Sequence, residues 1–255
     1  MSNYIETTNN KYQRPIGIDM TTKIFVFTPL EQQINRWAYI NDYLLTEIKL
    51  SGSRAKGTAI SKASDMDMFI SLSSSNTAPL GTIFNSLYSY FNTQTYSCRK
   101  QNVSIRVTFG GLNVDLVPGK RQHQHGNDHS LYKSKHDSWL QTNIDEHIRV
   151  VKNSSRIPEI IAAKIWRYRH NLPFPSIFLE LAIIKALLYK DTSDHDSNFL
   201  SLLEYIRDNI QTVNIIDPAN SNNVISNDLT SAEKKMIADK ARESRNKQNW
   251  NEILW

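Results

Sequence analysis

Residues 50–72, LSGSRAKGTAISKASDMDMFISL, contain a Gly52-Ser53 pair and an Asp65-x-Asp67 pair with eleven residues between them. Apolar runs on both sides predict that the two pairs are attached to neighbouring strands. Because successive side chains of a strand point to opposite faces, both carboxylates would share one face while the intervening methionines enter the core. Paired carboxylates suit Mg²⁺, and a glycine turn can bring backbone N–H groups close to a polyphosphate. The stretch therefore predicts a pocket that phosphates and their metal share.

The composition is that of a folded protein with a moderate positive charge. The chain has 255 residues, 40% of them hydrophobic, and carries 30 basic against 25 acidic side chains. One large domain or two small ones can be built from it, and nucleotide or nucleic-acid partners are compatible but not required. The single cysteine, Cys98, excludes an intrachain disulfide and fits a reducing compartment. With no secretory signal or membrane span in view, we expect a cytoplasmic protein without membrane contact.

A third carboxylate lies on a predicted hairpin. Residues 104–117, SIRVTFGGLNVDLV, read as two strands joined by a Gly-Gly turn. This register pairs Arg106 with Asp115 on the face opposite the apolar side chains. A carboxylate in a central strand needs a partner, and either Arg106 or a metal ion would supply it.

Several segments around these strands are predicted as helices. Residues 28–31, TPLE, have the form of a capping box with proline at the first helical position, so a helix is expected to start at residue 28. Residues 79–91 keep the apolar spacing of a buried helical stripe. Residues 1–22 show no apolar periodicity and are expected to form an arm.

Residues 118–137, PGKRQHQHGNDHSLYKSKHD, are polar, basic and rich in histidine. Without periodicity they are expected to form a surface loop. His123, His125 and His129 could chelate zinc, but no cysteine lies nearby to complete a site. A solvated loop is therefore the favoured interpretation.

The rest of the chain is predicted as helical, over residues 157–170, 176–189 and 199–210 and after a second capping box at residues 230–233. The last helix is basic, which is typical of a solvated face, with nucleic-acid contact as the alternative. The sheet half and the helical half are expected to meet around residues 140–155.

The combination of Gly52-Ser53, Asp65-x-Asp67 and a later strand aspartate resembles the signature of the DNA polymerase β nucleotidyltransferase superfamily. The segments KGTAISKASDMDMFISL and VDLVP are most similar to the branch with oligoadenylate synthetases, cyclic GMP-AMP synthase, the bacterial cyclic-oligonucleotide synthases (CD-NTases) of anti-phage defence and archaeal-type CCA-adding enzymes. AAKIWRYRHNLPFPSIFLELAIIKAL and DPANSNNV extend the resemblance through the helical half, so that it covers about residues 28–255.

This resemblance implies a role for each carboxylate. Asp65 and Asp67 would bind two Mg²⁺ ions, with Mn²⁺ as an alternative. Asp115 would bind the catalytic ion and act as the base, or organise the base, for the attacking hydroxyl. A solvated strand end is the alternative for the Asp65-x-Asp67 pair taken alone.

The resemblance also implies a set of phosphate ligands. Gly52 and Ser53 would hold the triphosphate, Lys164 would reach its β- or γ-phosphate, and Ser176 would add a hydroxyl at the start of its helix. The alternative for Lys164 is a core-helix lysine whose ammonium reaches solvent, and for Ser176 an ordinary N-cap. Lys56 either touches phosphate or is solvated.

The fold implied is α+β and bilobal, with a mixed β-sheet nucleotidyltransferase palm, an α-helical C-terminal lobe and the active site in the cleft between them. Residues 1–150 would form the catalytic palm with its N-terminal arm and helix. Residues 151–255 would form the helical nucleotide-binding domain.

The function implied is metal-dependent transfer of NMP from NTP substrates to a hydroxyl, with release of pyrophosphate. The product would be a cyclic or short linear oligonucleotide second messenger in bacterial anti-phage defence. Three alternatives stay open: a CCA- or tailing-type enzyme acting on RNA 3′ ends, a catalytically silent nucleotide-binding sensor, and transfer to a small molecule. The base, the linkage, the ring size and the oligomeric state are left open.

Overall fold

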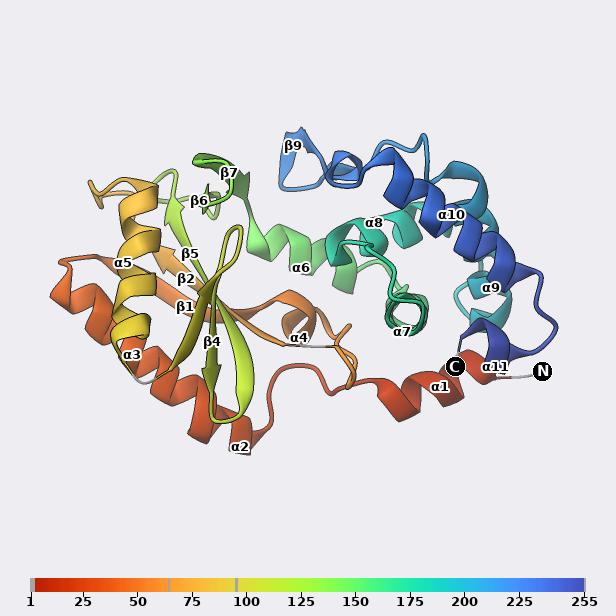
Figure 1. Cartoon of the computed structure of the whole chain (residues 1–255), viewed down its shortest axis with the longest axis horizontal. Coiled ribbons are helices and arrows are strands. Elements are labelled where there is room, and N and C mark those ends of the chain that lie inside the picture. The colour runs from red at the N-terminus through yellow and green to blue at the C-terminus, as the bar shows by residue number, and fades with distance from the viewer. Residues whose placement is uncertain (1–2, 64, 95, 255) are drawn as a thin grey trace. The chain divides into compact units, whose positions relative to one another are not determined.

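A computed structural model describes residues 3–63, 65–94 and 96–254. The described chain forms two compact units (Figure 1). A sheet unit contains residues 15–56 and 65–148, and a helical unit contains residues 3–14, 57–63 and 149–254. Both units are therefore assembled from segments that are discontinuous in the sequence.

The sheet unit is built on a mixed seven-stranded sheet. Its strands are β1 (Leu45–Ser51), β2 (Met66–Leu72), β3 (Ser97–Lys100), β4 (Ile105–Phe109), β5 (Leu112–Arg121), β6 (His129–Lys133) and β7 (Ser138–Thr142). The order is β1-β2-β5-β4-β3, with β6 paired to β5 and β7 paired to β6. Only the β2–β5 pair is parallel among these ladders. The expected α+β class with a mixed sheet is confirmed.

Helices cover one face of this sheet. The helical segments of the unit are α2 (Met20–Thr22), a π-helical turn η1 (Lys23–Phe27), α3 (Thr28–Ile40), the one-turn α4 (Gly52–Lys56) and α5 (Leu80–Thr93), with α6 (Ile144–Lys152) starting at its end. Trp37 of α3 and Phe84 of α5 share a buried core with Met66 and Met68 of β2. Because strand side chains alternate, residue 67, between these methionines, faces away from α3 and α5.

The first helix of this unit starts earlier than expected. Residue 28 was predicted as a helix start, but the chain is already helical from Met20, where the Asp19 side chain accepts a hydrogen bond from the Thr22 N–H at 2.8 Å. Phe27 has helical dihedral angles and caps nothing. The wider π-helical turn ends at Phe27, two residues before Pro29. Proline has no N–H and so cannot donate a backbone hydrogen bond to the preceding turn.

The prediction of a surface loop over residues 118–137 was wrong for residues 118–121 and 129–133, which belong to strands. β5 continues to Arg121, and residues 129–142 form the β6–β7 hairpin. His129 and Leu131 alternate with more exposed neighbours and are 3% and 4% exposed. The segment was mistaken for a loop because charged and polar residues occupy the outer positions of these short strands.

The helical unit surrounds a second hydrophobic core. Its elements are α1 (Tyr4–Tyr12), α7 (Ile157–Arg169), α8 (Ser176–Ala186), α9 (His195–Asn209), β8 (Ile216–Asp217), β9 (Asn220–Val224), the 3₁₀ turn η2 (Ile225–Asp228), α10 (Ser231–Arg245) and α11 (Trp250–Ile253). The capping box predicted for α10 is present, with reciprocal hydrogen bonds between Thr230 and Glu233. None of the helices in the described residues has the length and apolar character that crossing a membrane requires.

The N-terminal arm expected over residues 1–22 is in part a helix. The buried side of α1 is formed by Ile5, Thr8, Asn9 and Tyr12. Because half of these residues are polar, the segment has no apolar periodicity that would predict a helix. α1 and residues 57–63 pack with the later helices, so the compact units divide the chain differently from a cut after residue 150. The functional division into residues 1–150 and 151–255 stays a prediction.

Candidate active site

Two predicted metal-binding carboxylates lie side by side on the face of the sheet opposite α3 and α5. Asp67 of β2 and Asp115 of β5 are partners in the parallel ladder, and Ser51 pairs with Asp67 from the other side. Met66 and Met68 are 3% and 0% exposed, as the alternation predicted. Asp65 directly precedes β2 and is partly exposed.

Arg106 bridges the other two carboxylates. Its Nε and Nη2 atoms donate to the two oxygens of Asp115, each at 2.8 Å, and Nη2 also lies 2.5 Å from Oδ2 of Asp65. The Gln101 side chain adds a hydrogen bond to Asp115 Oδ1 at 3.0 Å. The predicted Arg106–Asp115 pairing is confirmed, and it is a bidentate, charge-assisted contact.

The surroundings of Asp67 favour a protonated carboxyl or a cation. Burial raises the pKa of Asp67 to about 6, and the negative charges of Asp115 and Asp65 act in the same direction. Lys56 and Arg106 oppose this shift through their positive charges. The negative charge of Asp67, beside two further carboxylates, is therefore not fully compensated by the positive charges of Lys56 and Arg106.

Gly52 is required by geometry on two grounds. Its φ of +60° lies in the left-handed region, and a Cβ atom at this position would overlap the Asp67 carboxylate. The backbone at the start of α4 thus approaches Asp67 more closely than any other residue type would allow. Ser53 follows in the same turn and is partly exposed.

The residues present fit a divalent metal. Asp65, Asp67 and Asp115 supply the hard oxygen atoms that Mg²⁺ and Mn²⁺ prefer. Within residues 3–63, 65–94 and 96–254, no group of three or more acidic, histidine or cysteine side chains is already gathered as metal ligands. At this site the Arg106 guanidinium lies between Asp65 and Asp115 and supplies part of the positive charge that a metal ion would supply.

Lys164 lies in the helical unit, within a buried polar cluster. Its ammonium donates to Glu180 Oε1 at 2.6 Å and to Thr58 Oγ1 at 2.7 Å, and the residue is only 2% exposed. Glu180 and Thr58 are fully buried. The alternative of a lysine that reaches solvent therefore does not apply, and the predicted phosphate contact would require this ion pair to open.

Ser176 is exposed at the first turn of α8, also in the helical unit. Its hydroxyl accepts a hydrogen bond from Arg167 Nη1 at 3.0 Å. The same Arg167 atom donates to the Phe174 carbonyl at 2.8 Å. The N-cap position is taken by Pro175 without a side-chain cap, so Ser176 is not the ordinary N-cap that was considered.

The three histidines of residues 118–137 differ in environment. His123 and His125 are exposed, whereas the ring of His129 is buried between the Asn127 carbonyl and Ser71 Oγ, each at 2.7 Å. In the part of the chain that the structure describes, they form no metal cluster. His129 is a core residue of the β5–β6 region.

Two site residues were missed or undervalued by sequence reasoning. Lys56 was left open as a solvated side chain, but it is 7% exposed and its charge acts on Asp67. Its spacing of four from Gly52, one helical turn, was the available signal. Gln101 gave no signal, because its contact with Asp115 depends on how the chain enters β4.

The fold is that of known nucleotidyltransferases. No family model matches the sequence. The solved structure of CdnC from E. coli MS115-1 with ATP superimposes with a TM-score of 0.75 at 21% identity, over 98% of this chain and 93% of that chain. The Cid1 poly(U) polymerase gives a TM-score of 0.67 at 12% identity, over 98% and 97% of the two chains.

The chain thus shares its fold with these two nucleotidyltransferases. A curated protein, the cyclic AMP-AMP-AMP synthase of Escherichia coli (strain MS 115-1), is 31% identical in an alignment of 166 positions that covers 57% of this chain. This chain spans about half, 51%, of the length of that relative. The resemblance to the cyclic-oligonucleotide synthases is confirmed.

Proposed function

We propose that the protein is a metal-dependent nucleotidyltransferase that joins NTPs into a short cyclic or linear oligonucleotide second messenger. The observation that carries the proposal is the pairing of Asp67 with Asp115 across two parallel strands, with Asp65 beside them and Gly52 against Asp67. A site of this kind places metal-binding oxygens and an unobstructed backbone turn within one small region. The similarity to a cyclic AMP-AMP-AMP synthase makes ATP the first substrate to examine.

The carboxylates would hold Mg²⁺ or Mn²⁺, and the ions when bound lower the pKa of the attacking hydroxyl and neutralise charge on the leaving pyrophosphate. Asp115 would take the proton of that hydroxyl or orient the group that takes it. Arg106 would exchange its contacts with Asp65 and Asp115 for other partners as the site is loaded. Its long side chain keeps the positive charge close to the site in either state.

The phosphate ligands are proposed from the same arrangement. The missing Cβ of Gly52 lets the turn pack directly against the Asp67 carboxylate. A triphosphate would bind along this turn, where Ser53 would donate its backbone N–H and hydroxyl. Lys56 would counter the added negative charge from the buried side of the turn. Lys164 and Ser176, both in the helical unit, stay proposed phosphate contacts.

A second candidate function is nucleotide addition to an RNA 3′ end. It is favoured by the similarity in fold to the Cid1 poly(U) polymerase over nearly the whole chain. Both candidates use the same three carboxylates and differ in the hydroxyl that attacks.

The experiment incubates the chain with each labelled NTP and Mg²⁺, with and without tRNA. A short product that forms without RNA supports the oligonucleotide synthase, and a label attached to tRNA supports the tailing enzyme. Asp67→Asn serves as the control and should abolish either product. Label incorporation that persists in Asp67→Asn would reject the site, and the absence of any product from the unmodified chain would favour the silent sensor.

A further inference from the structure

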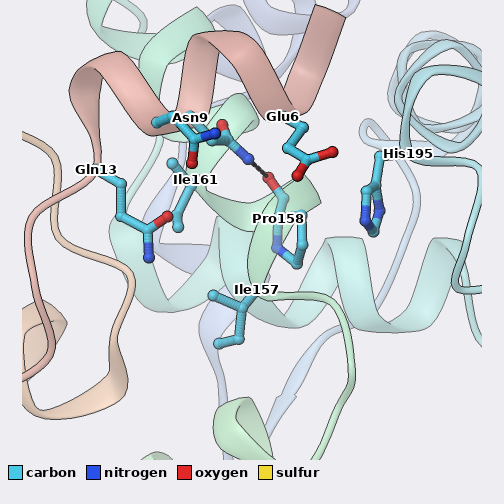
Figure 2. A pocket seen from close by; sticks show the side chains of 8 residues that line it. Glu6, Asn9, Gln13, Ile157, Pro158, Ile161 and His195 are labelled. Carbon is cyan, nitrogen blue, oxygen red and sulfur yellow. Dashed lines mark hydrogen bonds between the residues drawn. The ribbon is translucent and has the colours of Figure 1, made fainter. Parts of the chain in front are cut away.

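A pocket of about 230 Å³ lies in the helical unit, on the side of α7 that α1 covers (Figure 2). An apolar wall comes from the start of α7, with Ile157, Pro158 and Ile161. Polar side chains from α1 and the first residue of α9 complete the lining: Glu6, Asn9, Asn10, Gln13 and His195. None of these residues belongs to the carboxylate site on the sheet, so the pocket needs its own explanation.

Asn9 presents a hydrogen-bond acceptor that lacks a donor. Its Nδ2 atom donates to the Pro158 carbonyl at 2.9 Å (Figure 2). Since a carbonyl only accepts, this contact fixes the orientation of the amide and leaves Oδ1 on the other side. Asn9 is 4% exposed, and Oδ1 is buried without a donor among the described residues. An acceptor of this kind costs stability unless positive charge or a donor approaches it.

A second buried acceptor lies behind His195. Glu159 is fully buried, and its Oε1 accepts hydrogen bonds from His195 Nδ1 and Asn198 Nδ2, each at 3.0 Å. Arg156 Nη1 lies 3.7 Å from the same oxygen. The other oxygen, Oε2, has no donor within the described part of the chain. Because Nδ1 of His195 donates to Glu159, its Nε2 atom is an acceptor in the neutral ring.

A negatively charged side chain, Glu6, lies at the mouth of the pocket. Glu6 lies on the exposed side of α1, and its carboxylate points away from the helix toward the pocket (Figure 2). Glu6 and Asn9 thus bring acceptor oxygens to the lining of the pocket, whereas Glu159 lies behind His195 and outside the lining. Glu6 also accepts a hydrogen bond from Asn3 Nδ2. This arrangement disfavours an anion and favours a ligand rich in N–H donors.

We propose that this pocket binds a primary ammonium group carried on an aliphatic stem. The ammonium brings three donors and a positive charge to the Glu6 carboxylate and to His195 Nε2, which line the pocket. The stem packs against Ile157 and Pro158, as lysine side chains do on apolar surfaces. A transition metal is disfavoured, because among the described residues one carboxylate and one imidazole line the pocket, fewer than the three protein ligands of typical sites.

Free polyamines and the lysine side chains of a protein partner share this chemistry. Calorimetric titration of the full chain with 1,5-diaminopentane and with N-acetyl-lysine methylamide distinguishes them, and 1,5-pentanediol is the uncharged control. We expect saturable binding of one or both amines, weakened by added salt, and none of the diol. The amine that binds more tightly assigns the source, whereas failure of both amines to bind overturns the proposal.

Three variants test the location. Glu6→Gln should weaken amine binding about fivefold, the upper range for a partly solvated charge pair, and Gln13→Glu should strengthen it by a similar factor. Glu31→Gln, on α3 of the sheet unit, makes the same change in net charge and should leave the affinity unchanged. Equal affinities in Glu6→Gln and Glu31→Gln would overturn the proposal. Amine binding is measured without nucleotides, so its outcome does not depend on whether the proposed function is correct.

Discussion

At Gly52 the backbone approaches the Asp67 carboxylate so closely that a single methyl group would displace it. We predict that Gly52→Ala lowers nucleotidyl transfer by about 100-fold, since a shift of about 1 Å in a reacting group has effects of that order. It should also lose about 1–2 kcal/mol of stability from the left-handed backbone. Steady-state product formation and urea unfolding measure the two effects.

Gly111→Ala is the matched control for this prediction. Gly111 also has a positive φ, +78°, but nothing lies within 4 Å of the Cβ that alanine would add. The control should therefore show a similar loss of stability with nearly unchanged activity. An equal loss of activity in both variants would mean that strain, and not contact with Asp67, explains the effect.

Arg106 occupies two carboxylates that the proposed metal ions need. We predict that Arg106→Gln destabilises the metal-free protein by about 1–3 kcal/mol, because Asp115 loses its charged hydrogen bonds. The same variant should bind Mn²⁺ about tenfold more tightly, since the guanidinium no longer competes. Electron paramagnetic resonance of free Mn²⁺ reports the affinity.

Arg99→Gln controls for the change in net charge. Arg99 is exposed on β3, in register with Arg106, so its charge lies on the same sheet. Mn²⁺ affinity in this variant should match that of the unmodified chain. Weaker Mn²⁺ binding in Arg106→Gln than in Arg99→Gln would show that Arg106 supports the metal site and does not compete with the ion.

Among the elements of the helical unit, α7 and α8 are joined by the buried Lys164–Glu180 pair, which also holds Thr58. We predict that Lys164→Met costs about 3–5 kcal/mol, because it leaves the Glu180 charge buried without its partner. The double variant Lys164→Met/Glu180→Leu should recover most of that loss. Chemical unfolding of the single and double variants gives the coupling.

The double variant also separates structure from phosphate binding. If it folds but fails to use NTPs, Lys164 contacts the triphosphate as the resemblance implies. If it keeps its activity, the lysine serves only the packing of α7 and α8. Lys185→Met on α8 removes an exposed lysine and should change stability by no more than about 0.5 kcal/mol.

Burial of His129 makes the hairpin of β6 and β7 sensitive to acid. Burial lowers the pKa of His129 below its ordinary 6.5, and the positive charges of Arg121 and Lys49 act in the same direction, against the Asn127 carbonyl and Asp145. The unfolded state therefore binds a proton first, and the stabilising contribution is complete above pH 6.5 and is lost as the pH falls toward the folded-state pKa.

We predict that the unmodified chain loses about 1 kcal/mol more unfolding free energy between pH 7.5 and 5.5 than His129→Gln does. His123→Gln removes an exposed ring and should keep the pH dependence of the unmodified chain. The midpoints of urea unfolding of the unmodified chain and both variants, measured at the two pH values, test this prediction. Identical pH dependence in all three proteins would contradict the assignment.

For the molecule as a whole, the sequence predicted what local patterns determine. The period of two through Met66, Asp67 and Met68 predicted that Asp67 faces away from the buried methionines. The Gly-Gly turn predicted the register that pairs Arg106 with Asp115. Both features depend on residues that are close in the chain.

Contacts between distant segments could not be predicted in this way. Thr58 follows the phosphate turn but packs beside Lys164, more than one hundred residues later in the sequence. α1 buries Thr8 and Asn9, polar residues that only a tertiary neighbour can accommodate. The discontinuous units of the molecule arise from such contacts, which carry no local pattern.

Product analysis with ATP tests the central claim most directly. The chain is incubated with ATP and Mg²⁺, and phosphodiester products and pyrophosphate are quantified by chromatography and mass spectrometry. We predict adenylate oligonucleotides from the unmodified chain and none from Asp65→Asn/Asp67→Asn, with circular dichroism unchanged between them. Oligonucleotides at the same rate from the double variant would contradict the assignment of these carboxylates to nucleotidyl transfer.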